Sequence, residues 1–135
     1  MGTLLLLASC WQSDHGELEG HAAPVPADFR FLRARAPCYL EVGSDELRSI
    51  RVNCFHIEGN LHIHSNRFAR FPRLRGESWV EALRREPQAR VSIAGNIYSV
   101  RGTPFDDPAD RETILHARGY WYAWDGITIF RFSER

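Results

Sequence analysis

The chain reads SWVEALRREPQARVSIAGNIYSV from residue 78 to residue 100, and this stretch decides the fold. In its first half a tryptophan, an alanine and a leucine share one face of a short amphipathic helix, which Pro87 ends. In its second half apolar and polar residues alternate on both sides of Ala94-Gly95-Asn96, whose residue types tolerate the positive φ of a tight turn. The stretch therefore predicts a helix followed at once by a β-hairpin.

Three strands are predicted before this stretch. Residues 37–42, 48–57 and 61–66 each alternate with the period of a half-buried strand. Glu58-Gly59-Asn60 supplies turn residues between the second and the third of them, so these two strands should form another hairpin.

One helix and one strand are predicted after it. Asp106 or Asp107 can cap a helix that begins near Pro108, and Gly119 is a suitable C-terminal cap. Residues 127–132 then alternate as a sixth strand. Neighbouring strands joined mostly by hairpins can close into a small barrel, which leaves the helices to cover an open end. We therefore expect a mainly β fold (β+α) with six antiparallel strands and two short helices.

The first 26 residues are expected to lie outside this domain as a leader and tether, with the folded domain at residues 27–135. Leu-Ala-Ser-Cys10 follows a short apolar run and resembles the lipobox of a bacterial lipoprotein signal, which would place a lipid on Cys10. An ordinary apolar N-terminus with an incidental cysteine is the alternative. The first reading predicts a lipid-anchored protein on the periplasmic side, and the second a cytoplasmic protein.

The charged residues limit the classes of partner that the chain can be expected to bind. Its 17 basic residues, all of them arginine, balance 17 acidic residues, so no net field draws it toward nucleic acid. Four arginines, Arg67, Arg70, Arg73 and Arg75, crowd one predicted loop. The planar guanidinium favours bidentate contact with phosphate or carboxylate, so this loop is the first candidate for an anion site. A solvated basic loop is the alternative.

The first two predicted strands each carry one cysteine. Folding the chain about Glu46 would set Cys38 opposite Cys54 and permit a disulfide in an oxidising compartment. Two separate buried thiols are the alternative, and we favour it because the sequence does not fix the register.

Three segments, at residues 48–53, 62–66 and 78–91, resemble the FMN- or deazaflavin-binding split β-barrels, which include pyridoxamine-phosphate-oxidase-like and deazaflavin-dependent nitroreductase-like proteins. The third segment carries most of the resemblance, since it looks like the family's tryptophan-led helix that ends in a proline and enters a strand. The similarity covers residues 38–132. It implies a six-stranded antiparallel split β-barrel, FMN or deazaflavin as cofactor, a small-molecule substrate and a homodimer.

Resemblance and residue chemistry together nominate the residues that would bind the cofactor. The resemblance implies contacts from the second strand, the third strand and the loop beyond, and the arginines of that loop fit a phosphate. A tryptophan that opens an amphipathic helix could flank an aromatic ring system, although it is more often a core residue. The expected cofactor-binding residues are Arg51, Asn53, His64, Ser65, Asn66, Arg67, Arg70, Arg73, Arg75 and Trp79.

The expected function is that of an oxidoreductase acting on a small molecule, because a bound flavin carries the hydride and the protein positions it. No catalytic residue is nominated. A non-catalytic barrel, lipid-anchored if Cys10 is acylated, that holds a small ligand or a protein partner is the first alternative. His62 and His64 share one strand face and suggest a metal or haem site as the second, with no third ligand fixed by spacing.

Overall fold

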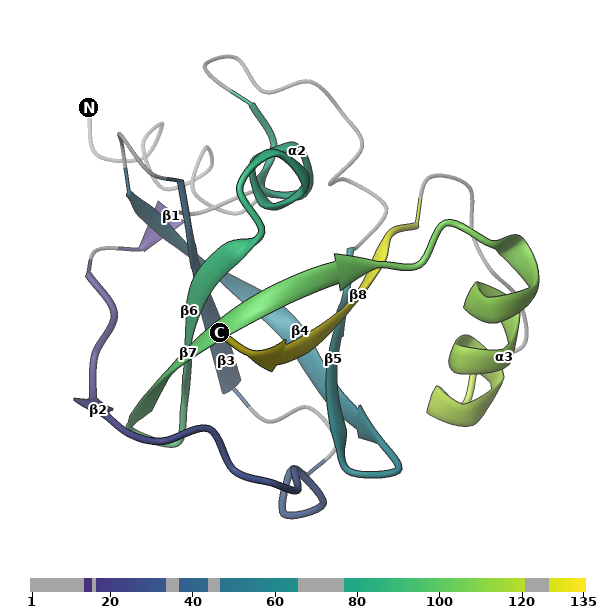
Figure 1. Ribbon diagram of the computed structural model, residues 1–135, viewed down its shortest axis with the longest axis horizontal. Coiled ribbons are helices and arrows are strands. Elements are labelled where there is room, and N and C mark those ends of the chain that lie inside the picture. Colours follow the sequence, from purple (N-terminus) through teal and green to yellow (C-terminus); the bar gives the residue numbers. More distant parts are fainter. Residues whose placement is uncertain (1–13, 16, 34–36, 44–46, 66–76, 121–126) are drawn as a thin grey trace, which may run out of the picture.

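The computed structural model describes residues 14–15, 17–33, 37–43, 47–65, 77–120 and 127–135. Hydrogen bonds join six antiparallel strands in the order β4-β3-β6-β7-β8-β5, and the pairing of β4 with β5 closes the circle (Figure 1). The predicted six-stranded antiparallel split β-barrel is therefore confirmed. Its strands are β3 (Pro37–Val42), β4 (Arg48–Ile57), β5 (Asn60–His64), β6 (Gln88–Ile93), β7 (Asn96–Pro104) and β8 (Ile129–Glu134).

Both predicted hairpins form with two-residue loops. Glu58 and Gly59 lie at φ 52° and 84° between β4 and β5, and Ala94 and Gly95 lie at φ 51° and 84° between β6 and β7. Positive φ at both central residues is the turn geometry that matches the right-handed twist of paired strands. Local turn chemistry therefore sets the register of these two strand pairs.

The two helices begin and end close to the predicted residues. The shorter helix, α2 (Trp79–Arg85), is capped by Ser78, whose hydroxyl accepts from the amide of Glu81 at 3.1 Å. In α3 (Pro108–Arg118) the cap is Asp107, and Gly119 ends the helix at φ 103°. Among the described residues, neither helix is long and apolar enough to cross a bilayer.

The inward side chains of all six strands form the main core. One end of the barrel is covered by α2, which buries Trp79, Ala82 and Leu83, and residues 29–32 run past the other end (Figure 1). Phe29 and Leu32 belong to the same core. The edge of the Phe29 ring meets the Tyr98 ring of β7, with 5.8 Å between centroids. The barrel is thus a filled core and not a pore.

Cys38 and Cys54 form a disulfide, with 5.9 Å between their Cα atoms. The preference for two separate thiols was therefore wrong, and so was the expected register. Val42 pairs with Arg48, which places Cys38 opposite Val52 and makes Cys54 its diagonal neighbour. Both registers point the two cysteines inward, because they differ by two residues and side chains alternate with period two.

The segment expected to be a tether lies partly along the barrel. A strand of two residues, β1 (Asp14–His15), pairs with Ile50 and Ser49 of β4, and a second, β2 (His21–Ala22), pairs in parallel with β7. We call residues 17–23 the strap, because they cross from β4 to β7 (Figure 1). The domain boundary near residue 27 stays a prediction.

A second apolar cluster lies outside the barrel wall. It joins Ile114 and Leu115 of α3 to Phe55, Ile127 and Ile129, with Ile57 and Phe105 packed against it. Its wall residues come from β4, from β8 and from the residues just before β8. The barrel wall is therefore covered on this side by a packed helix.

Candidate functional site

The exposed residues of β4 mark one candidate site. Ile50, Val52 and Cys54 point into the barrel, so Arg51 and Asn53 point outward, and both are exposed. Asn53 is opposite His64 of β5 in the sheet register. We call Arg51, Asn53 and His64, together with Ser65 at the end of β5, the β4–β5 corner.

His64 is buried in this corner. Its side chain is 3% exposed, and its Nδ1 lies 2.9 Å from the carbonyl oxygen of Ser65. Since a carbonyl can only accept, Nδ1 carries the proton in this bond. Burial lowers the pKa of His64, and the positive charge of Arg118 lowers that pKa further. The ring is therefore a neutral imidazole at pH 7.

Ser65 fixes the end of β5. Its amide donates to the carbonyl of Thr128, and its hydroxyl accepts from the amide of Thr128, both at 2.8 Å. This reciprocal pair ties the chain at the end of β5 to the chain just before β8. The corner thus has a rigid backbone, while Arg51 and Asn53 supply its exposed polar groups.

The other predicted cofactor residues divide into two groups. Trp79 is 7% exposed in the main core, with 6.1 Å between its ring centroid and that of Phe130. The structure thus gives Trp79 a packing role, and its contact with a cofactor stays a prediction. The remaining residues lie outside the described part of the chain: Asn66, Arg67, Arg70, Arg73 and Arg75.

The structure buries His62 as well as His64. Its side chain is 4% exposed and lies between the rings of Phe55 and Phe105, with centroids 5.5 and 5.8 Å away. Burial lowers the pKa of His62, as do the charges of Arg131 and His56. In the described ranges, no three His, Cys, Asp or Glu side chains gather into a metal-ligating group.

The sequence analysis did not predict that aromatic side chains pack around His62 and His64. Phe55 stacks on His62, and the guanidinium carbon of Arg118 lies 4.6 Å from the Phe55 ring centroid. A signal for it was present in β4, whose outward positions change from Arg51 and Asn53 to Phe55 and Ile57. That change marks the point along the strand where α3 begins to cover the wall.

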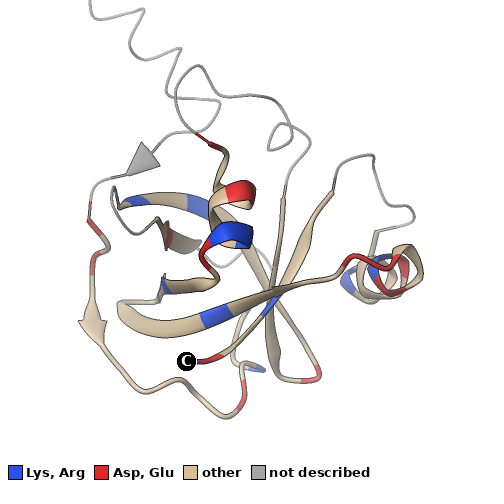
Figure 2. Cartoon of the chain, turned by 45° about the horizontal axis from the view of Figure 1, so that its top comes forward, with Lys and Arg blue, Asp and Glu red and all other residues tan. Residues whose placement is uncertain are grey.

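Charges of both signs are distributed over the described elements. Both helices and the barrel strands carry arginines, and both helices carry acidic residues as well (Figure 2). On the barrel wall, Glu41 of β3 accepts two bonds from Arg90 of β6, at 2.8 and 3.0 Å. The arginine at the β4–β5 corner is thus set in a surface of mixed charge.

No family model matches the chain, and no curated protein matches it by sequence. Two solved structures are similar in fold. One is a Listeria innocua protein provisionally assigned as a pyridoxamine 5'-phosphate oxidase, with a TM-score of 0.52 and 14% identity over 73% of this chain and 83% of that one.

The other is a NimC/NimA family protein from Clostridium acetobutylicum. It superposes with a TM-score of 0.50 and 18% identity, over 72% of each chain. At such identities the likeness establishes architecture and leaves activity to be argued from the residues. Together with the closed six-stranded barrel, it shows that the chain has the split-barrel fold of the pyridoxamine-phosphate-oxidase-like and NimC/NimA proteins.

Proposed function

We propose that the chain binds a flavin-type cofactor, FMN or a deazaflavin, at the β4–β5 corner and uses it for redox chemistry on a small molecule. The observation that carries the proposal is the outward, exposed placement of Arg51 and Asn53 beside the end of β5. The arginine-rich sequence at residues 67–75 follows that end directly in the chain.

The corner suits the phosphate of such a cofactor. A guanidinium and a side-chain amide both donate hydrogen bonds, and bonds from a charged donor to a phosphate oxygen are about twice as strong as neutral ones. Arg51 and Asn53 lie on β4, which pairs with β3 and β5, so these donors stand on a rigid strand, which favours a defined binding geometry.

His64 would contribute as a neutral polar group. With Nδ1 bonded to the Ser65 carbonyl, its ring holds a fixed orientation, and its centroid lies 5.7 Å from that of Phe55. A bound flavin would supply the hydride chemistry. The residues of this chain would then bind and orient the cofactor and exclude water from it.

The names of the fold neighbours add support of a coarser kind. One is assigned as a pyridoxamine 5'-phosphate oxidase, which names a phosphate-bearing substrate and a redox reaction for that protein. Proteins with the same architecture have other activities, so these names support only the fold and the general class of chemistry.

An absorbance titration of the full chain with FMN, and separately with a deazaflavin, tests the proposal. We expect binding by one of them and a loss of about tenfold or more in affinity for Arg51→Ala, since hydrogen bonds to charged groups contribute about 1.5 to 3 kcal/mol. Arg101→Ala is the control, because Arg101 is exposed on β7. Equal affinities for the two variants, or no binding of either cofactor, would refute the proposal.

The disulfide is evidence about the cellular compartment of the protein. Disulfides persist in oxidising compartments, so the Cys38–Cys54 bond supports the exported location over the cytoplasmic one. We therefore propose the periplasmic side, with the lipid on Cys10 as its anchor. Mass spectrometry of the protein from a membrane fraction tests this, since an unmodified Cys10 would contradict the anchor.

A further inference from the structure

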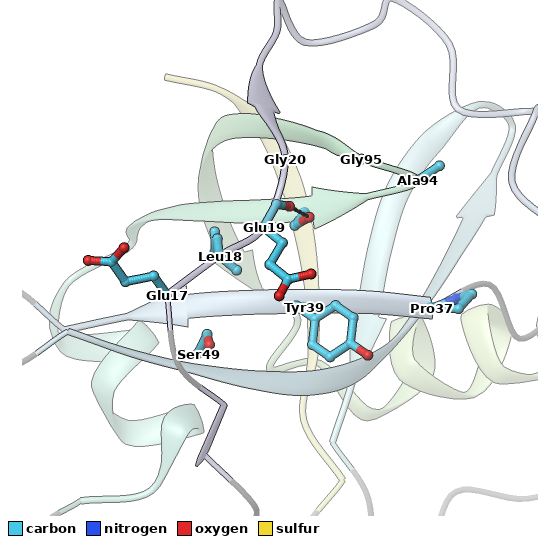
Figure 3. A pocket seen from close by; sticks show the side chains of 10 residues that line it. Glu17, Leu18, Glu19, Gly20, Pro37, Tyr39, Ser49, Ala94 and Gly95 are labelled. Carbon is cyan, nitrogen blue, oxygen red and sulfur yellow. Dashed lines mark hydrogen bonds between the residues drawn. The ribbon is translucent and has the colours of Figure 1, made fainter.

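A cavity lies between the strap and the outer barrel wall. Its volume is about 870 Å³, and part of its wall comes from Tyr39 of β3, Ser49 of β4 and Ser92 of β6 (Figure 3). Residues 17–20 of the strap form the opposite side. Cavities of roughly 300 to 1,000 Å³ are the usual size of small-molecule sites.

The strap is fastened at the β7 side of this cavity. The Ser92 hydroxyl donates to the carbonyl of Glu19 at 2.7 Å, and the amides of His21 and Ala23 donate to the carbonyls of Gly95 and Ile97 at 2.9 and 3.0 Å. These bonds hold the strap at a fixed place above the wall. The cavity beneath the strap is therefore fixed by the same hydrogen bonds.

Gly20 lets the strap approach the hairpin closely. It lies at φ 134°, and a Cβ at this position would sit 2.5 Å from the carbonyl oxygen of Gly95. Only glycine fits both the backbone angle and the contact. The sequence at this position is therefore matched to a docked strap.

Glu17 and Glu19 both belong to the cavity lining, and no arginine is among its described lining residues. Two arginines lie next to that lining, since the charge of Arg90 acts on Glu17 and Arg51 pairs with Tyr39 in the sheet. Glu19 extends toward Tyr39, whereas the carboxylate of Glu17 points away along the strap (Figure 3). One carboxylate and one aromatic ring thus face a shared space, with hydroxyl groups at Ser49 and Ser92.

We propose that this cavity binds a small organic cation, an amine or amidine attached to a flat ring. The cationic group pairs with Glu19, and the ring packs against Tyr39, whose electron-rich face also attracts a cation. A phosphate or carboxylate ligand is disfavoured here because like charges repel. The proposal uses none of the corner residues, but the two sites are neighbours, since Tyr39 pairs with Arg51 in the sheet.

Calorimetric titration of the full chain with three matched probes tests the charge preference. Benzamidine, benzamide and benzoate share a ring and differ in charge. We expect benzamidine to bind about two- to fivefold tighter than benzamide, with binding weakened by salt, and benzoate to bind least, since an exposed ion pair contributes up to about a fivefold change. Equal binding of all three probes, or a preference for benzoate, would overturn the proposal.

Three glutamine variants locate the cation. Glu19→Gln should weaken benzamidine binding about two- to fivefold and Glu17→Gln less, because only Glu19 faces Tyr39. Glu19→Gln keeps the strap in place, since Ser92 bonds to the backbone carbonyl of that residue. Glu134→Gln, on the exposed end of β8, is the control. An unchanged affinity in Glu19→Gln would refute the role of this carboxylate.

A variant that fills the cavity with a larger side chain tests whether benzamidine binds there. Leu18 lines the cavity from the strap and is partly exposed, so Leu18→Trp adds bulk without disturbing the barrel core. Circular dichroism checks that the variant folds. Loss of benzamidine binding in the folded variant supports the site, and wild-type binding would overturn it.

Discussion

The barrel wall is covered on two sides, and the two coverings differ in kind. On the side of β4 and β8, α3 inserts Ile114 and Leu115 into an apolar cluster. On the side of β3 and β6, the strap is held by backbone and hydroxyl bonds and leaves a cavity of about 870 Å³ beneath it.

The difference shows how covering and binding can be separated in one small domain. A helix that packs by side chains gains stability from every atom it buries, and the pocket beside α3 is correspondingly smaller, at about 240 Å³. A segment bonded mainly through its backbone needs few side chains for attachment, and the side chains of Glu17 and Glu19 stay available. We therefore expect α3 to affect stability most and the strap to affect ligand binding most.

Truncating the helical covering should have the largest effect on stability. Leu115 is fully buried in the second cluster. Leu115→Ala should lower the free energy of unfolding by about 2 to 5 kcal/mol, because it removes buried methyl groups and leaves a void. Chemical denaturation measures this change. Leu18→Ala on the strap is the comparison, and an equal loss there would contradict the contrast between the two coverings.

Detaching the strap should have the next largest effect. Gly20→Ala introduces a Cβ that meets the Gly95 carbonyl, at a φ that side chains rarely adopt. We expect a loss of about 1 to 3 kcal/mol and faster hydrogen exchange at the amides of His21 and Ala23, with the barrel still folded.

Gly95→Ala is the matched control for this change. Gly95 also has a positive φ, of 84°, but a Cβ there meets nothing within 4 Å. It should therefore cost only the backbone strain and leave the amide of Ala23 protected. Equal exchange rates in the two alanine variants would show that the close contact at Gly20 does not hold the strap.

Acid should weaken the side covered by α3. Burial lowers the pKa of both His62 and His64 in the folded chain from the ordinary value of 6.5. Below about pH 6.5 the unfolded chain binds these protons and the folded chain does not, so stability falls as the pH falls, by at most about 1.4 kcal/mol per pH unit for each histidine. The loss continues until the pH reaches the folded-state pKa values.

Glutamine variants isolate this pH dependence. His62→Gln and His64→Gln should each flatten the curve of unfolding free energy between pH 7 and pH 5. A curve that keeps its full slope in both buried variants would mean that other groups cause the acid sensitivity.

Removing one anchor of the strap should have the smallest effect. Ser92→Ala deletes the hydroxyl that donates to Glu19, which should lower the free energy of unfolding by about 1 kcal/mol. Ser99→Ala, exposed on β7, should change it by less than about 0.5 kcal/mol. Denaturation curves that coincide for the two variants would show that the backbone bonds alone fasten the strap.

The sequence predicted best what short-range chemistry controls. Gly59 and Gly95 have a positive φ in the two hairpins, and Asp107 and Gly119 cap α3, as their residue types favour. The register of β3 and β4 was mispredicted because the turn between them carries no comparable signal, and both registers keep Cys38 in the core.

The candidate site was predicted less completely, since its surroundings depend on long-range contacts. Alternation placed Arg51 and Asn53 outward, and Phe55 and Ile57 on the same face indicate a covered wall, but the sequence does not identify α3 as its cover. Two-residue strands such as β1 and β2 have no periodicity to detect, so the strap and its cavity could not be foreseen.

The pairing of β8 with both β5 and β7 has a consequence for the time at which the protein folds. On a ribosome β5 is complete at His64, but its partner β8 begins only at Ile129, 65 residues later. At about 5 to 20 residues per second, the edge of β5 waits roughly 3 to 13 s for that partner. During this interval an unpaired edge can bond to another chain, so the growing polypeptide is more prone to aggregation than the finished barrel.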